Sequence, residues 1–211
     1  MTEVFDRNCR LCPRLARFLD HVAENNPGYY CKPVPPFGDA LARLLIVGLA
    51  PGMHGANRTG RPFTGDHAGI LLYRMLHEFR FSDRPESLVA EDGLRLINCR
   101  ITNAVKCLPP DNKPVGAEIS TCNRFLANEL RSMAARSVVL ALGGIAHRAV
   151  IRAMGLRQSD YPFSHGSVHR VDERLQLLDS YHCSRYNTNT RRLTADMFRE
   201  VFARARDLVT A

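Results

Sequence analysis

Several features that mark membrane and exported proteins are missing from this chain of 211 residues. No apolar run approaches the roughly 20 residues that cross a bilayer, so we expect no membrane partner. The N-terminus, MTEVFDRNCRLCP, lacks the basic start and apolar core of a secretory signal. Internal repeats, low-complexity tracts and clear linkers are also missing. We therefore expect one domain over residues 1–211, a monomer, in the cytoplasm.

Acidic residues are fewer than basic ones. There are 21 Asp and Glu against 29 Lys and Arg, which gives a formal net charge of +8. Such an excess favours a polyanionic partner, with nucleic acid first and an acidic membrane surface second. A well-solvated basic surface that binds neither explains the same count.

Apolar runs alternate with segments of helical spacing along the chain. Buried strands separated by helices indicate an α/β fold with a parallel sheet covered on both faces. We expect strands at Leu44–Leu49, within Leu94–Val105, at Ser137–Leu142 and at Leu175–Ser180. We expect helices at Ile70–Phe79, about Ala117–Met133, Ile145–Met154, and from an N-cap at Thr194 to about Leu208.

Three polar stretches lie at or just after the ends of expected strands. They are GLAPGMHGANRTGRPFTGD (48–66), NAVKC (103–107) and YHCSRYN (181–187). Ligands of open parallel sheets bind beyond the carboxyl ends of the strands, so we expect these stretches to form one crevice. The first is as rich in glycine as a phosphate-binding loop, but it lacks the GK[ST] ending of a P-loop.

Seven cysteines are unusual for a protein of a reducing compartment, and an odd number cannot all pair. Cys9 and Cys12 form a CxxC pair that does not follow a strand, which disfavours a thioredoxin-like redox role. With Cys107 and Cys122 they offer four thiolates for a zinc ion or an iron–sulfur cluster, and spacing alone does not choose between these. Cys99 lies within an expected strand, where simple burial explains it.

Taken in order, GLAPGMHGANRTGRPFTGD, TNAVKCLPPDNKP and HCSRYNTNTRRLT resemble the motifs of the uracil-DNA glycosylase superfamily, most closely its family 5 or type b branch from bacteria and archaea. The resemblance runs from Cys9 through the last helix. It implies a three-layer α/β/α fold with a central four-stranded parallel sheet. It also implies a structural [4Fe–4S] cluster, whose ligands fall on Cys9, Cys12, Cys107 and Cys122.

The resemblance implies a monofunctional enzyme of base-excision repair. Such an enzyme hydrolyses the N-glycosidic bond of uracil, and often of other deaminated bases such as hypoxanthine and xanthine, and leaves an abasic site in DNA. Its partner is DNA that contains these bases. Three alternatives remain: a damaged-DNA-binding protein of the same fold without excision activity, an RNA- or nucleotide-directed hydrolase, and a zinc-stabilised structural protein.

The reaction requires a flipped base, an anion near the sugar, a positioned water and donors to the departing base. Asp66 matches the carboxylate that the type b branch supplies at the end of the first motif; in family 4 the acidic residue falls where Leu49 stands. The alternative for Asp66 is a helix N-cap. Asn103 matches the residue that reads the base edge, and His182 the residue that hydrogen-bonds the departing base.

The remaining positions implied by the resemblance surround the base and the DNA backbone. Phe63 matches the aromatic residue on which the flipped base stacks, and Gly48, Ala50 and Gly52 let backbone N–H groups approach it. Arg191 stands where glycine is usual, and Cys183 where proline is usual, which bears on loop shape. The expected DNA contacts are Asn57, Arg58, Ser184, Arg185, Asn187, Asn189 and Arg191. For Asn57 and Arg58 the alternative is to shape the loop.

Overall fold

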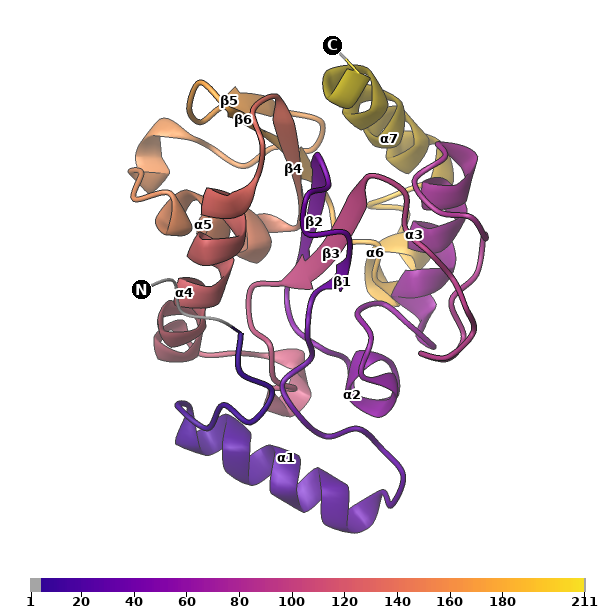
Figure 1. Ribbon diagram of the computed structural model, residues 1–211, viewed down its shortest axis with the longest axis vertical. Coiled ribbons are helices and arrows are strands. Elements are labelled where there is room, and N and C mark those ends of the chain that lie inside the picture. The colour runs from indigo at the N-terminus through magenta and orange to yellow at the C-terminus, as the bar shows by residue number, and fades with distance from the viewer. Residues whose placement is uncertain (1–4, 211) are drawn as a thin grey trace.

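A computed structural model describes residues 5–210 and shows a central sheet between two layers of helices (Figure 1). Four strands are parallel, in the order β3-β2-β4-β6. They are β2 (Leu44–Gly48), β3 (Cys99–Asn103), β4 (Ser137–Leu142) and β6 (Leu175–Ser180). The expected α/β class and all four expected parallel strands are confirmed.

The sheet has six strands rather than the four expected, because a short antiparallel strand closes each edge. β1 (Phe37–Gly38) pairs with β3, and β5 (Val168–Arg170) pairs with β6. Neither strand contains the apolar run that identifies a buried strand, since each is only partly covered. Edge strands of this length protect the sheet from pairing with another chain.

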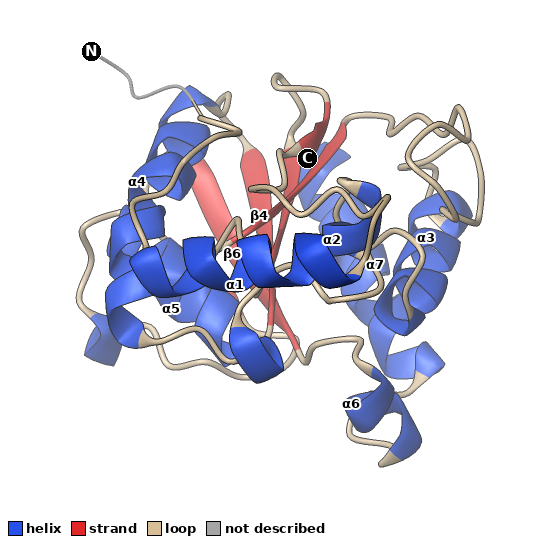
Figure 2. Ribbon diagram, turned by 90° about the horizontal axis from the view of Figure 1, so that it is seen from below, coloured by secondary structure: helices blue, strands red, loops and turns tan. Residues whose placement is uncertain are grey.

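The two faces of the sheet are covered by different helices (Figures 1 and 2). Alternate side chains of β2 point to opposite faces: Leu44 and Ile46 belong to one core cluster, Leu45 and Val47 to the other. The first cluster includes α3 (His67–Glu78) and α7 (Ala195–Thr210), and the second α4 (Gly116–Ser132) and α5 (Gly144–Ala153). All four helices were expected, and Thr194 caps α7 by accepting the N–H of Met197 at 3.2 Å.

Three further helices complete the described chain, and two of them, α1 and α2, lie in the lower part of Figure 1. They are α1 (Pro13–Asn25), α2 (Ala56–Thr59) and α6 (Arg185–Asn189), and short 3₁₀ turns occupy Pro110–Asn112 and Gln158–Asp160. α1 buries Leu15, Leu19 and Val22, one stripe at helical spacing. Among residues 5–210 no helix combines the length and apolarity that a bilayer crossing requires.

Candidate active site

A cavity of about 360 Å³ opens at the carboxyl ends of the parallel strands. All three polar stretches reach it, so the expectation that they form one crevice is confirmed. Seven of the residues around it come from the first stretch or lie next to its end, and the others end or follow β3 or follow β6. They are Leu49, Ala50, Gly52, Ala56, Phe63, Asp66, Ala68, Asn103, Asn112, His182 and Ser184.

Gly48, the last residue of β2, lies directly behind two of the residues that line the cavity. Gly48 is paired in register with Asn103 at the end of β3. A Cβ on Gly48 would stand 2.7 Å from Cζ of Phe63 and would also collide with Oδ1 of Asn103. Phe63 has a positive φ of 53°, which places its ring against the strand ends. The ring is stacked on that of His182, with centroids 5.8 Å apart.

Asn103 presents an unpaired acceptor to this cavity. The residue is 4% exposed, and among the described residues its Oδ1 has no hydrogen-bond partner. A buried amide oxygen without a partner is costly, so the site is arranged for a ligand that donates a hydrogen bond here. The N3–H of a uracil-like base is such a donor.

Asp66 is both a helix cap and a lining residue of the cavity. Its Oδ1 accepts the N–H of Gly69 at 2.9 Å as the N-cap of α3. Its Cβ would lie 2.7 Å from a Cβ on Gly55, so glycine there lets the carboxylate reach its position. Burial raises the pKa of Asp66, against the opposing effect of the N–H groups of Gly69 and Ala68. Asp66 can therefore cap α3 with one carboxylate oxygen and line the cavity at the same time.

His182 follows β6 and faces the cavity as a neutral imidazole. Burial lowers the pKa of His182 to about 4. Its backbone is held by Asn187, whose Nδ2 donates to the carbonyl of His182 at 2.8 Å. Ser184 caps α6 by accepting the N–H of Asn187 at 3.4 Å. Ser184 and Asn187, expected to contact DNA, are thus used within the protein to shape this loop.

The other expected DNA contacts divide into surface and interior positions. Arg58 and Arg185 line a wider cavity of about 810 Å³ that shares Gly52, Asp66 and Asn112 with the first. Asn189 and Arg191, which follow Arg185 closely in the sequence, are exposed. Arg191 has a positive φ of 56°, the backbone conformation for which glycine is usual.

Asn57, one of the expected DNA contacts, lies inside the protein in this structure. It is fully buried, and its Nδ2 donates to Sγ of Cys31 at 3.5 Å. Its backbone carbonyl also accepts the N–H of Cys31 at 3.1 Å. Asn57 therefore shapes the first loop from inside, while its neighbour Arg58 is the exposed residue.

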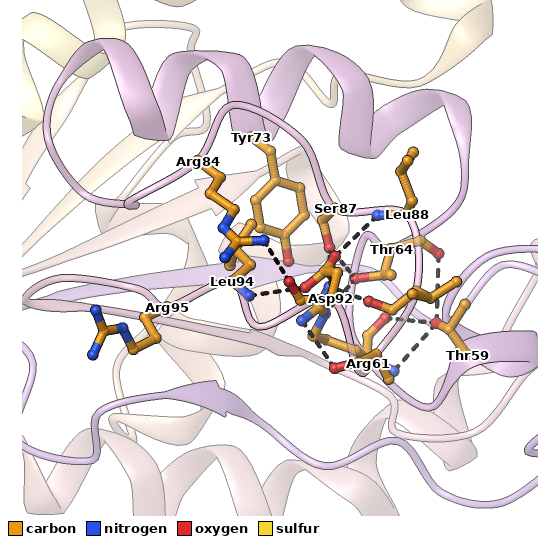
Figure 3. Close-up of polar contacts among 12 residues, drawn as sticks. Thr59, Arg61, Thr64, Tyr73, Arg84, Ser87, Leu88, Asp92, Leu94 and Arg95 are labelled. Carbon is orange, nitrogen blue, oxygen red and sulfur yellow. Dashed lines mark hydrogen bonds and ion pairs between the residues drawn. The ribbon is translucent and has the colours of Figure 1, made fainter.

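A buried arginine that the sequence motifs do not single out supports this loop. Arg61 is 5% exposed, and its guanidinium donates to Thr64 and to the 87–92 segment (Figure 3). It lies 2.9 Å from Oγ1 of Thr64, 2.7 Å from Oγ of Ser87 and 2.5 Å from Oδ2 of Asp92. Burial alone would raise the pKa of Asp92, but its hydrogen bond to Arg61 lowers it overall.

Asn112 is a second lining residue that the motif comparison missed, although it lies in TNAVKCLPPDNKP. It lines both cavities from a 3₁₀ turn, with a positive φ of 55°. The Asp-Asn pair after two prolines is the available sequence signal, since Asp and Asn tolerate this conformation better than other residues with side chains.

The structure also brings together Cys9, Cys12, Cys107 and Cys122, which line one small cavity between α1 and α4. None of them is in a disulfide. Burial raises the pKa of Cys122 to about 11 and, with the neighbouring sulfurs, raises that of Cys107 further. The backbone N–H of Lys106 points to Sγ of Cys122 at 3.3 Å. Four sulfurs around one space, with a donor to one of them, fit a group held by four thiolates.

The three remaining cysteines lie outside this cluster. Cys99 is fully buried in β3, as expected. Cys183 is also fully buried, and the charge of Asp66 adds to burial in raising its pKa. Cys31 is partly exposed, has a positive φ of 45° and contacts Asn57.

A parallel sheet between helices, with a base-sized cavity at the carboxyl ends of its strands, is the architecture of a nucleotide- or base-binding α/β protein. The family model of the uracil-DNA glycosylase superfamily matches residues 35–206. The chain therefore belongs to the uracil-DNA glycosylase superfamily.

Relatives within this family resemble the chain over nearly its whole length. It is 48% identical over 205 residues to a type-5 uracil-DNA glycosylase of Thermus thermophilus. The aligned segment covers 95% of this chain and 93% of the relative. A type-5 uracil-DNA glycosylase of Pyrobaculum aerophilum is 41% identical over 94% and 88% of the two chains. A type-4 uracil-DNA glycosylase of Archaeoglobus fulgidus is 30% identical over 71% and 69%.

Proposed function

We propose that this protein is a uracil-DNA glycosylase of the type-5 kind. It hydrolyses the N-glycosidic bond of uracil, and of other deaminated bases, in DNA and leaves an abasic site without cutting the strand. The observation that carries the proposal is the buried, unpaired Oδ1 of Asn103, which lies in a cavity shared with Phe63, Asp66 and His182. Membership of the family and the names of the relatives support it.

The base occupies the cavity with its ring on Phe63 and its edge against Asn103. The Oδ1 of Asn103 accepts a hydrogen bond from the base, and its Nδ2 is free to donate to a neighbouring carbonyl oxygen. The absence of a side chain at Gly48 keeps both groups in place. This geometry admits a flipped base and excludes one that remains stacked in a duplex.

Bond cleavage leaves positive charge on the sugar and negative charge on the base. The carboxylate of Asp66 orients the water and stabilises the cationic sugar, because it is held in place by the N-terminus of α3. Neutral His182 donates a hydrogen bond to the base as it becomes an anion. A pKa of about 4 means that the ring does so without carrying a charge at neutral pH.

The four clustered cysteines hold a [4Fe–4S] cluster in this proposal. A cluster of this type supplies a stable, thiolate-bound core that ties α1 to α4 and to the segment after β3. Its cavity shares no lining residue with the base cavity, although Ala50 of the base cavity packs against the same hydrophobic cluster as Cys9, Cys12 and Cys107. In this proposal the iron–sulfur group takes no part in the reaction. The protein acts as a single-domain monomer on DNA in the cytoplasm of a bacterium or archaeon, the groups to which the named relatives belong.

The test compares the protein with Asp66→Asn on a uracil-containing duplex, with alkaline cleavage of abasic sites as the readout. Asparagine still accepts the Gly69 N–H but carries no charge, so α3 remains capped. We expect single-turnover excision to fall by about 10² to 10⁴-fold while DNA affinity is retained. Excision by the variant at the original rate would contradict the role given to Asp66.

The same assay decides between excision and mere recognition of damaged DNA. A protein that binds the duplex but releases no base, at any enzyme concentration, would be a binding protein of the same fold. Duplexes and single strands that contain uracil, hypoxanthine or xanthine establish the base range. Uridine in RNA and free dUMP test the alternative of a different nucleic-acid or nucleotide substrate.

A further inference from the structure

A second cluster of polar side chains lies in the interior between α5 and the β5–β6 edge of the sheet (Figure 1). His147 of α5, His169 of β5 and Asp179 of β6 direct one ligand atom each to a common point. These three atoms lie within 4.8 Å of one another. Asp179 is fully buried, and the side chain of His169 is 15% exposed. None of the three lines either cavity of the base site.

The hydrogen bonds of His147 determine which of its ring nitrogens carries the proton. Nε2 lies 2.8 Å from the carbonyl oxygen of Tyr161. A carbonyl only accepts, so Nε2 carries hydrogen and Nδ1 of the neutral ring has a lone pair. Yet Nδ1 lies 2.8 Å from Oδ1 of Asp179, which is also an acceptor. Two acceptors at this distance repel each other unless a cation lies between them.

The other oxygen of the carboxylate and the second histidine are also left without hydrogen-bond partners among the described residues. Oδ2 of Asp179 lies 3.3 Å from Nε2 of His169. Within residues 5–210 neither atom has a hydrogen-bond partner. Buried polar atoms are normally paired, so two orphans at one point indicate a missing partner that both atoms share. An added proton on Nδ1 of His147 would satisfy the contact with Oδ1 of Asp179, but it would not pair Oδ2 of Asp179 with Nε2 of His169.

We propose that His147, His169 and Asp179 bind a divalent transition-metal ion such as Zn²⁺. Two imidazoles and one carboxylate are a usual ligand set for this ion. A metal-bound imidazole typically donates its other N–H to a backbone carbonyl, and the contact from His147 to Tyr161 has this form. The rings of Phe163 and Tyr161 lie edge-on to His147 and His169, with centroids 5.7 Å and 5.9 Å apart, and shield the point from water.

The ion would join α5 to β5 and β6, two strands that already pair with each other. Its ligands come from α5, the edge strand β5 and β6, and the Tyr161 carbonyl adds the segment between α5 and β5. Asp179 precedes His182 by three residues along the chain. The bound metal therefore stabilises the edge of the sheet that leads to the base site, and its role is structural.

The test measures zinc binding to the whole protein with its four-cysteine group intact. Protein dialysed against EDTA is equilibrated with micromolar Zn²⁺, and bound zinc and iron are counted per chain by mass spectrometry. We expect one zinc beyond any metal held by the cysteines, and a melting temperature that rises with zinc concentration. In His169→Gln, zinc affinity should fall by more than about tenfold, with iron content unchanged.

Two further variants keep the outcome unambiguous. His21→Gln removes an exposed histidine of α1 and should bind zinc as the unchanged protein does. Asp179→Asn should lose the zinc-dependent rise in melting temperature. No additional zinc on the unchanged protein would overturn the proposal and leave a proton as the shared cation. Equal zinc on the protein and on His169→Gln would also overturn it. Uracil excision, assayed in parallel, reports on the base site separately.

Discussion

At the scale of single residues, Gly48 shows how little room the base site leaves. In Gly48→Ala the new methyl group would stand 2.7 Å from Cζ of Phe63 and would overlap Oδ1 of Asn103, so at least one of these two base-site side chains must shift. We expect a loss of about 1–3 kcal/mol in the free energy of unfolding and a marked fall in excision. Urea denaturation and single-turnover kinetics measure the two effects.

The control for this change is Gly116→Ala at the start of α4, where a Cβ meets no atom within 4 Å. Alanine is the better helix residue, so its stability should be unchanged or slightly higher and its excision unaffected. Equal behaviour of the two variants would contradict the tight packing described around Gly48.

His182 offers a pH-dependent test at the same scale. Burial favours the neutral ring and lowers its pKa to about 4, whereas an unfolded histidine titrates near 6.5. Between these values the unfolded chain binds more protons at this site than the folded one. Stability contributed by the site is therefore fully present above about pH 6.5 and decreases as the pH falls toward 4.

The measurement is an NMR titration of histidine ring signals, with His182→Gln used to assign the signal of His182. We expect this signal to remain that of a neutral ring down to about pH 4. A midpoint near 6.5 would mean that the ring is solvated, and its proposed role as a neutral donor would then fail.

At the scale of elements, Arg61 connects the loop after β2 to the 87–92 segment through several buried hydrogen bonds. Arg61→Ala removes the arginine partner of Asp92 and leaves the buried hydroxyl groups of Thr64 and Ser87 without this hydrogen-bond donor. We expect a loss of about 3–5 kcal/mol in the free energy of unfolding, measured by urea denaturation.

The matched control is Arg95→Ala. Arg95 also faces an aspartate, Asp83, but its side chain is 84% exposed and the ion pair is 3.5 Å long. An exposed pair of this kind contributes about 0–1 kcal/mol. If both variants lose the same stability, the Arg61 network does not hold the loop.

The proposed iron–sulfur group would supply part of the attachment of the N-terminal helix α1. Apart from Leu15 and its neighbours, α1 is joined to α4 by an ion pair of 2.8 Å between Arg14 and Glu118. We expect Cys107→Ser to lose the brown iron–sulfur absorption and to expose α1 to proteolysis. Cys31→Ser, outside the cluster, should retain both colour and resistance. A full complement of iron in Cys107→Ser would refute the ligand assignment.

The elements differ in how far the sequence predicts them. β2, β4 and β6 have apolar runs, and α3, α4, α5 and α7 have an apolar stripe, so their positions follow from burial alone. β1 and β5 were missed because pairing, rather than burial, defines them. α1 also has an apolar stripe, but it was not predicted, because the CxxC pair just before it was interpreted only as a pair of possible metal ligands.

The site shows the same division. Asn103, Phe63 and His182 belong to motifs, and the structure places them around one cavity. The partners of Arg61 in the 87–92 segment lie 26 or more residues away from it, in a segment without regular structure, and no local pattern indicates such contacts. The internal hydrogen bonds of Asn57 and Asn187 were missed for a related reason, since a polar side chain in a polar loop looks exposed until its partner is known.

At the scale of the whole molecule, the net charge of +8 gives the DNA complex a dependence on salt. Arg185 lines the wider cavity beside the base site. If it contacts one phosphate, Arg185→Ala should reduce the slope of log affinity against log salt by about 0.9. Fluorescence anisotropy between 50 and 200 mM salt, about the range over which such slopes are resolved, measures it.

Arg204 on α7 provides the control, because it is exposed on a helix that does not line either cavity. Arg204→Ala lowers the net charge equally but should leave the slope unchanged. A similar change in both variants would mean that overall charge, and no contact by Arg185, sets the salt dependence.

The base site is assembled from segments that are far apart in the order of synthesis. Gly48 follows β2, Asn103 ends β3 and His182 follows β6. A nascent chain on the ribosome therefore has no complete site until His182 has emerged, and α7, which covers β4 and β6, comes later still. Products of premature termination before this point are catalytically inert, so unfinished copies present no risk to the genome. Recovery of excision after dilution from denaturant likewise reports completion of the whole sheet.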